Sequence, residues 1–303
     1  MEGSTQLRDV YDRVAVNGVE LACSQRGAGE PVVFVHGGLS DIDYMESIAA
    51  RFADQFRAIA YSRRFAWPNP PLADSVQDPI ATHVTDLAEL LSSLAGAPAH
   101  VVGHSWGASV CLLLAATRPE LVRTLTLIEP EVFAVFTGSP PSVGKILHLT
   151  VTRPRVAWIV IRAAAGAQPI RNAYRRGHDQ EAVRLAINWI NGFDAFSELS
   201  QADRTHVLAN VAFSRAGALA GPVKLSAEDA RRIDSPTLLV VGERSPKVMR
   251  LSVAELNGLI KRSEVCVIPN ASHGMISQNP GALDAAIRSF MSAHAGVSPQ
   301  SRS

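Results

Sequence analysis

The stretch from Ala99 to Leu114, AHVVGHSWGASVCLLL, constrains the fold of this chain most strongly. A short apolar run stops at Gly103-His104-Ser105-Trp106-Gly107, and an apolar run of helical character follows directly. The pattern G-x-S-x-G between a strand and a helix predicts a sharp turn that exposes the serine above a sheet. Glycines are expected where a Cβ would collide with the neighbouring strand or helix. The helix N-terminus that follows favours a negative charge beside Ser105.

Apolar runs alternate with helical patterns over most of the chain, which is typical of a largely parallel sheet covered by helices. Asn17-Gly18 separates two alternating runs and predicts a hairpin. The continuous apolar runs that follow are typical of strands buried on both faces. The expected strands are 10–16, 19–24, 31–35, 56–61, 100–102, 122–128, 237–241 and 263–268, and the expected core helices are 42–52, 80–94, 108–116, 248–260 and 280–294.

The strand rhythm stops between Val132 and Arg232, where segments such as 154–165, 180–190 and 203–209 show helical spacing. This interval falls between two expected strands of the sheet, so it is expected to form a helical lid above the sheet's C-terminal edge. The sequence therefore predicts four regions. They are a first core part over 1–131, the lid over 132–232, a second core part over 233–295 and a disordered tail over 296–303.

Composition narrows the possible partners and the cellular location. The net charge is +1, which gives no reason to expect nucleic acid or an anionic membrane as a partner. No window reaches the roughly 18 apolar residues of a membrane helix, and the polar N-terminus is unlike a signal peptide. Cys23, Cys111 and Cys266 lack metal-like spacing. We expect a cytoplasmic monomer or homodimer that uses no metal and no cofactor.

The order of these motifs resembles the α/β-hydrolase family. His36-Gly37-Gly38 follows a strand, GHSWG follows another, a helical segment intervenes, and TLLVVGERSP and SHGM precede the last helix. The resemblance extends from about Val10 to His294. It implies a mostly parallel, twisted eight-stranded sheet with helices on both faces and an inserted helical lid. It also implies the chain order nucleophile, acid, histidine.

The resemblance assigns the nucleophile and its base. Ser105 is a weak nucleophile alone and needs a base within hydrogen-bond reach. His273, in PNASHGM, lies in the loop after the last strand, where the chain returns to the sheet's C-terminal edge. This places it beside the sharp turn that carries Ser105, which we call the elbow. In the family this loop carries the catalytic base, so His273 is expected to take the proton of Ser105.

The catalytic acid departs from the usual family pattern. Most members have an aspartate after the seventh strand, where this chain has Ser245 in GERSP. Glu129 ends the strand after the elbow helix, and some members, including the zearalenone lactonases and certain dehalogenases, place a glutamate there. Glu129 is therefore the expected acid. Glu243 or a Ser-His pair supported by water are alternatives, and Glu129 could instead only cap the entrance to the lid.

Backbone donors and apolar side chains complete the expected site. The amide of Trp106 and the amide of Gly38, in the loop after the third strand, are expected to form an oxyanion hole. The apolar residues expected to line the substrate pocket are Leu39, Phe133, Phe136, Trp158, Trp189 and Met275. Trp158 and Trp189 could instead belong to the lid's own core, because aromatic residues in a helical lid more often pack there than contact the substrate.

These residues predict hydrolysis of a carboxylic ester or lactone of an apolar small molecule through an acyl-enzyme. Epoxide hydrolysis and dehalogenation are disfavoured because they need a carboxylate in place of Ser105. Other reactions on the same fold, namely C–C bond hydrolysis, amide cleavage and perhydrolysis, remain alternatives. A catalytically weak protein that binds a small molecule in the pocket is a further alternative, because the usual aspartate is missing.

Overall fold

The fold is known from a computed structural model, which describes residues 11–72, 79–96, 98–138, 140–192, 194–220 and 223–295. Its centre is an eight-stranded sheet in the order β1-β2-β4-β3-β5-β6-β7-β8. The β1–β2 and β2–β4 pairs are antiparallel and the other pairs are parallel. The strands are β1 (Asp12–Val16), β2 (Val19–Arg26), β3 (Pro31–Val35), β4 (Arg57–Tyr61), β5 (Ala99–His104), β6 (Val122–Ile128), β7 (Thr237–Gly242) and β8 (Ser263–Ile268). The expected fold class is therefore confirmed.

Turn chemistry and strand periodicity explain why these segments form the sheet. Asn17 and Gly18 both have positive φ, 43° and 75°, which a two-residue hairpin turn requires, and Val16 pairs with Val19 across it. In β3 alternate residues face opposite sides of the sheet. Val33 packs into the core on one side and Phe34 into the core on the other, so a continuous apolar run suits this strand.

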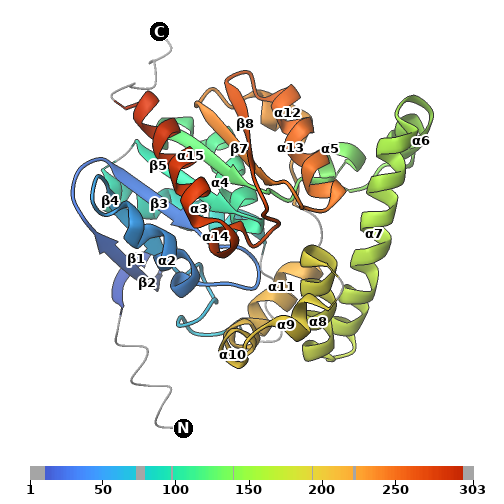
Figure 1. The fold of residues 1–303 in the computed structure, drawn as a ribbon, viewed down its shortest axis with the longest axis horizontal. Helices are drawn as coiled ribbons and strands as arrows, with labels where there is room; N and C mark the ends of the chain where they lie inside the picture. Colours follow the sequence, from blue (N-terminus) through green and yellow to red (C-terminus); the bar gives the residue numbers. More distant parts are fainter. Residues whose placement is uncertain are drawn as a thin grey trace.

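Helices cover both faces of the sheet (Figure 1). The side chains of α3 (Ile80–Leu90), α4 (Trp106–Thr117) and α13 (Lys247–Leu259) pack in one core, and those of α2 (Ile42–Phe52) and α15 (Pro280–Ala293) pack in the other. One π-helical turn, η2 (Leu91–Ala95), extends α3 to Gly96, whose φ of 63° ends it. The short elements η3 (Pro119–Leu121) and α14 (Met275–Gln278) have too few residues to show a period in the sequence.

A helical insertion, residues 133–231, lies between β6 and β7. Figure 1 shows it beside the C-terminal edge of the sheet, with α6 and α7 at its outer side. Its helices are α5 (Phe133–Thr137), α6 (Val143–Thr152), α7 (Pro154–Arg175), α8 (Asp179–Asn191), α9 (Ala195–Glu198), α10 (Gln201–Ala209), α11 (Val211–Ala220) and α12 (Ala227–Arg231). Helix α7 runs ten residues beyond its expected end at Ala165. It continues through Gly166, where a Cβ would lie 2.3 Å from the indole nitrogen of Trp189 in α8, so a glycine leaves room for that ring.

Two further expectations concern the chain's ends and its relation to membranes. The tail expected to be disordered, 296–303, lies outside the described residues. Among the residues that the structure describes, no helix is both long enough and apolar enough to cross a membrane.

Candidate active site

Ser105 occupies a strained turn between β5 and α4. Its φ of 56° and ψ of −124° lie in a region that non-glycine residues rarely adopt, and its amide donates to the carbonyl of Ile128 at 2.8 Å. A Cβ on Gly107 would lie 2.2 Å from the carbonyl oxygen of His36, and one on Gly103 would lie 2.6 Å from the Cα of Ala108. The expected steric reason for both glycines therefore holds in the structure.

The carboxylate of Glu129 contacts His273 directly. Oε2 of Glu129 lies 2.7 Å from Nδ1 of His273, and the Glu129 side chain is fully buried. Glu129 follows β6 with a φ of 48° and precedes the helical insertion, whereas His273 lies far beyond the insertion, in the loop after β8. With Nδ1 engaged by the carboxylate, Nε2 is the ring nitrogen that remains for Ser105, which lines the same cavity.

The second oxygen of Glu129 is held by β7 and the loop after it. The amide of Gly242 donates to Oε1 at 3.0 Å, and the hydroxyl of Ser245 donates to the same oxygen. Burial alone would raise the pKa of Glu129, but the hydrogen bonds from His273, Gly242 and Ser245 outweigh it and lower the pKa below its ordinary value. Glu129 is therefore a carboxylate at neutral pH, and Ser245 supports it from the position where most family members have the acid.

A second histidine holds the backbone of the His273 loop. Nε2 of His104 lies 3.0 Å from the carbonyl oxygen of His273, and the two rings lie 4.6 Å apart. Burial, and then the nearby His273, lower the pKa of His104 to about 3. His104 thus stays neutral, and its Nε2–H donates a hydrogen bond to the carbonyl oxygen, which fixes where the His273 loop lies.

The loop after β3 approaches the elbow closely and is held by a buried arginine. A Cβ on Gly37 would lie 3.2 Å from the Cβ of Ser105, and Gly37, Gly38 and Trp106 all line the cavity. Arg63 donates from Nε to the carbonyl of His36 at 3.1 Å and from Nη2 to the carbonyl of Gly37 at 2.6 Å. Its guanidinium also stacks 4.4 Å from the ring centre of Trp106. Arg63 therefore connects both segments that carry the expected oxyanion donors.

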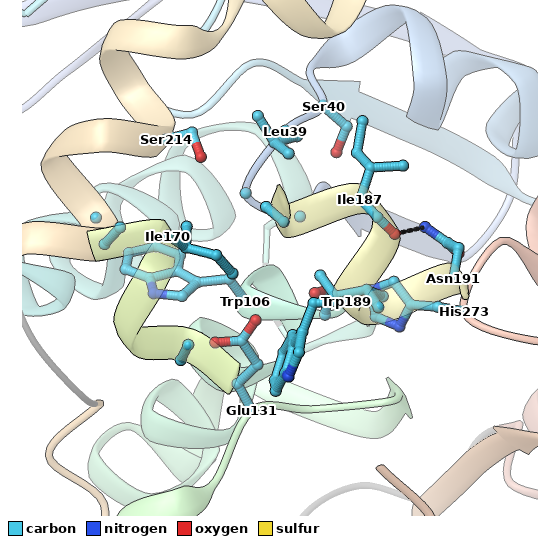
Figure 2. A pocket seen from close by; sticks show the side chains of 18 of the residues that line it. Leu39, Ser40, Trp106, Glu131, Ile170, Ile187, Trp189, Asn191, Ser214 and His273 are labelled. Carbon is cyan, nitrogen blue, oxygen red and sulfur yellow. Dashed lines mark hydrogen bonds between the residues drawn. The ribbon is translucent and has the colours of Figure 1, made fainter. Parts of the chain in front are cut away.

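A cavity of about 1100 Å³ lies between this site and the helical insertion. Ser105 and His273 line it, and mostly apolar residues of α7, α8 and α11 contribute much of the rest of its wall. Three of the expected pocket residues line it, namely Leu39, Phe133 and Trp189. Figure 2 shows Trp189 and Trp106 facing the same space as His273.

The other three expected pocket residues do not line this cavity. Phe136 packs among Leu149, Ala157 and Val160, which themselves form part of the wall. Trp158 is 61% exposed on the outer side of α7. Met275 is fully buried in the core under α15. These predictions were wrong because the direction of a side chain on a helix depends on packing that the local sequence does not specify.

Sequence reasoning missed a carboxyl group that faces the cavity, Glu131. It follows Glu129 by two residues, and Figure 2 shows it pointing toward the space between Trp106 and Trp189. Burial raises the pKa of Glu131, while nearby His273 and Arg171 act in the opposite direction. The Glu-Pro-Glu sequence after an expected strand was the signal that could have identified it, because strand ends meet at the sheet edge that carries the site.

A polar cluster joins the insertion to the core beside the loop after β3. Asn210 donates to Oδ2 of Asp41 at 2.6 Å and accepts from the amide of Trp67 at 2.9 Å. Nε2 of His206 lies 3.1 Å from Oδ1 of Asp41. Potential metal-ligating atoms of Asp41, Asp43 and His206 lie within 4.8 Å of one another, but protein donors already satisfy Asp41. We interpret the cluster as a contact between insertion and core.

The comparisons with known proteins agree with this fold. The family model described as alpha/beta hydrolase fold matches residues 30–280. A 2-(acetamidomethylene)succinate hydrolase of Mesorhizobium japonicum is 25% identical over 299 residues, covering 93% of this chain and 95% of that protein. An uncharacterised hydrolase of Bacillus subtilis, YraK, is 30% identical over 125 residues, which are 41% of this chain and 46% of that protein. The enol-lactonase structure from Burkholderia xenovorans superimposes with a TM-score of 0.68 at 16% identity, covering 93% of this chain and all of that one.

Proposed function

This chain belongs to the alpha/beta hydrolase fold family, and we propose that it is a serine hydrolase that cleaves a carboxylic ester or lactone of an apolar small molecule. The contact of 2.7 Å between Glu129 and His273, beneath a mostly apolar cavity that Ser105 also lines, carries this proposal. A buried carboxylate that holds one ring nitrogen of a histidine is the arrangement that makes the other nitrogen a base. The proposed catalytic residues are Ser105, His273 and Glu129.

In the proposed reaction, Ser105 attacks the carbonyl carbon of the substrate while His273 accepts the hydroxyl proton. Glu129 orients the imidazole and stabilises its positive charge. The amides of Trp106 and Gly38 stabilise the oxyanion of the tetrahedral intermediate. His273 then gives the proton to the leaving alkoxide; the alcohol of an ester departs, whereas the hydroxyl of an opened lactone stays attached to the acyl group. Water, deprotonated by His273, attacks the acyl-enzyme, and His273 returns the proton to the Ser105 oxygen as the carboxylic acid leaves.

We also propose that the helical insertion acts as the lid expected from the sequence. Residues of α7, α8 and α11 form walls of the cavity, so the insertion sets which substrates fit above Ser105. The mostly aliphatic and aromatic character of these walls supports an apolar acyl or alcohol group. The cluster of Asp41, His206 and Asn210 would hold the lid against the core.

A panel of p-nitrophenyl esters of increasing acyl length tests the proposal. We expect turnover by the wild type and loss of turnover in Ser105→Ala. Ser277→Ala is the matched control, because Ser277 also lines the cavity but lies outside the elbow. If the wild type hydrolyses no ester, or if Ser105→Ala hydrolyses esters as fast as the wild type, the proposal is wrong.

Amide hydrolysis on the same machinery is the second candidate. It is favoured by the similarity to a 2-(acetamidomethylene)succinate hydrolase along nearly the full length of both chains. Matched ester and anilide substrates with the same acyl group distinguish the two reactions. The ester proposal predicts a much higher kcat/KM for the ester, whereas a comparable kcat/KM for the anilide would favour the second candidate.

A further inference from the structure

The outer face of α6 and α7 exposes an unusual set of apolar side chains. Among the described residues, eight large apolar side chains are strongly exposed, and five of these belong to α6 and α7. Four of them are 61% to 81% exposed, and we call these the apolar face: Val143, Leu147, Val151 and Trp158. The fifth, Ile161, is 48% exposed and also lines the cavity, so it is not counted in this face. A group of large exposed apolar side chains on neighbouring helices is typical of a surface that interacts with another body.

Helix α6 has two apolar sides. Val143, Leu147 and Val151 recur at intervals of four residues and therefore share one side, which is exposed. Ile146 and Leu149 lie on the other side and line the cavity. A helix that is apolar on two sides is expected to have both covered, and in this structure only the inner side is covered.

The charge of this part of the chain is strongly one-sided. Residues 132–178 contain seven Lys and Arg residues and no Asp or Glu, although the whole chain has a net charge of only +1. Lys145, Arg155 and Arg162 are exposed beside the apolar face, and the Arg162 guanidinium lies 5.6 Å from the ring centre of Trp158. Arg153 is paired with Glu255 of α13 and does not add to this free positive charge.

We propose that the apolar face and its flanking cations dock on the surface of an anionic lipid bilayer. Aliphatic side chains, a tryptophan and cationic side chains together suit the boundary between acyl chains and negatively charged headgroups. A symmetric pairing with a second copy would bring the same cations together, so charge opposes it. A nucleic acid would match the arginines but would leave the aliphatic side chains without a partner.

Docking would bring the cavity close to the lipid. Leu149 of α6 and Ala157, Val160 and Ala163 of α7 line the cavity on the inner side of the two helices that carry the apolar face. The bilayer would therefore contact the helices that roof the site. The binding itself does not depend on the proposed function, because it is measured without a substrate.

Co-sedimentation with vesicles tests the proposal, using the inactive Ser105→Ala variant throughout to keep binding separate from catalysis. We expect binding to vesicles of phosphatidylcholine mixed with phosphatidylglycerol and much weaker binding to phosphatidylcholine alone. The double variant Arg155→Glu/Arg162→Glu should bind the anionic vesicles at least about tenfold more weakly than the parent. Lys224→Glu/Lys261→Glu changes the net charge equally in other segments and should bind like the parent.

The apolar part of the surface has its own test. Leu147→Ser/Trp158→Ser removes exposed side chains, so the variant should fold normally. Its melting temperature should lie within a few degrees of the parent's, as expected for surface changes. The variant should also bind vesicles more weakly. No binding of the parent to anionic vesicles overturns the proposal. An equal loss of binding in Lys224→Glu/Lys261→Glu would also overturn it. Two further results would do the same: binding to duplex DNA that Leu147→Ser/Trp158→Ser leaves unchanged, or a dimer that this variant dissociates in a protein that binds no vesicles.

Discussion

The Oε2 atom of Glu129 lies 2.7 Å from Nδ1 of His273, although 144 residues separate the two in the chain. The carboxylate is fully buried, and its other oxygen accepts from Gly242 and Ser245. Each oxygen therefore has a fixed partner, and one of them is the imidazole. The carboxylate of Glu129 comes from the end of β6, whereas most members of the family have the acid in the loop after β7. Both positions allow a carboxylate to contact the histidine.

Replacing Glu129 by glutamine tests the role of this carboxylate. Glu129→Gln keeps the size of the side chain but removes the charge that stabilises a protonated His273, so kcat should fall on the order of 10²-fold or more. Ser245→Ala should reduce kcat far less, because the amide of Gly242 still holds Oε1. Both are measured with an ester that the wild type hydrolyses. Near-normal kcat in folded Glu129→Gln would show that another group is the acid.

Arg63 should affect catalysis through the loop after β3. Arg63→Lys replaces the planar guanidinium fork, which donates to the carbonyls of His36 and Gly37 from two separate nitrogens, by a compact ammonium that does not match this geometry. We expect kcat to fall about tenfold with a smaller change in KM, because misplaced oxyanion donors weaken binding of the transition state above all. Arg64→Lys is the matched control, as Arg64 pairs with Asp86 instead. Equal losses in both variants would contradict a specific role for Arg63.

Two glycines of the insertion should respond to alanine in opposite directions. In Gly166→Ala the new Cβ would lie 2.3 Å from the indole nitrogen of Trp189, so the helices must shift, at a cost of about 1–3 kcal/mol. Gly217 lies within α11 with nothing within 4 Å of an added Cβ. Gly217→Ala should stabilise the protein by up to about 1 kcal/mol through helix propensity. Thermal unfolding of both variants measures the difference, and a lower melting temperature for Gly217→Ala than for Gly166→Ala would contradict this packing.

The contact between His206 and Asp41 should make stability depend on pH. The hydrogen bond with Asp41 raises the pKa of His206 above its ordinary value of 6.5, and Asp43 and Asp203 act in the same direction. Folding therefore favours the protonated imidazole. The resulting stabilisation is fully present below the ordinary pKa and is lost as pH rises through the raised pKa.

Denaturant unfolding of His206→Gln measures this contribution. The difference in the free energy of unfolding from the wild type should be larger at about pH 5.5 than at about pH 9. His148→Gln, which replaces an exposed histidine of the same insertion, is the matched control. A destabilisation of His206→Gln that grows with rising pH would contradict a raised pKa for His206 in the folded protein.

The sequence predicts the sheet and the elbow well because their signals are local. Alternation around Asn17-Gly18, continuous apolar runs and the G-x-S-x-G pattern each lie within a few residues, and every expected strand occurs close to its expected bounds. The contact that Ser245 makes with Glu129 could not be predicted in this way. It joins residues 116 apart in the chain, and only the parallel register of β6 and β7 brings them together.

The cavity walls were the least predictable part of the site. Trp158 and Trp189 occur in similar apolar helical patterns, yet one is exposed and the other faces the cavity. Their directions depend on how α7 packs against α8 and α13. Arg63 shows the same limit, because its loop sequence gives no sign that the side chain is buried against the carbonyls of His36 and Gly37.

Labelling of Ser105 by a fluorophosphonate tests the central claim most directly, because it needs no knowledge of the substrate. Intact-protein mass spectrometry with peptide mapping should find one adduct on Ser105 in the wild type and none in Ser105→Ala. Labelling of Glu129→Gln should be slower by at least about tenfold, since the base that activates the serine is weakened. An unlabelled wild type, or equal labelling rates in the wild type and Glu129→Gln, would contradict the proposed Ser105-His273-Glu129 triad.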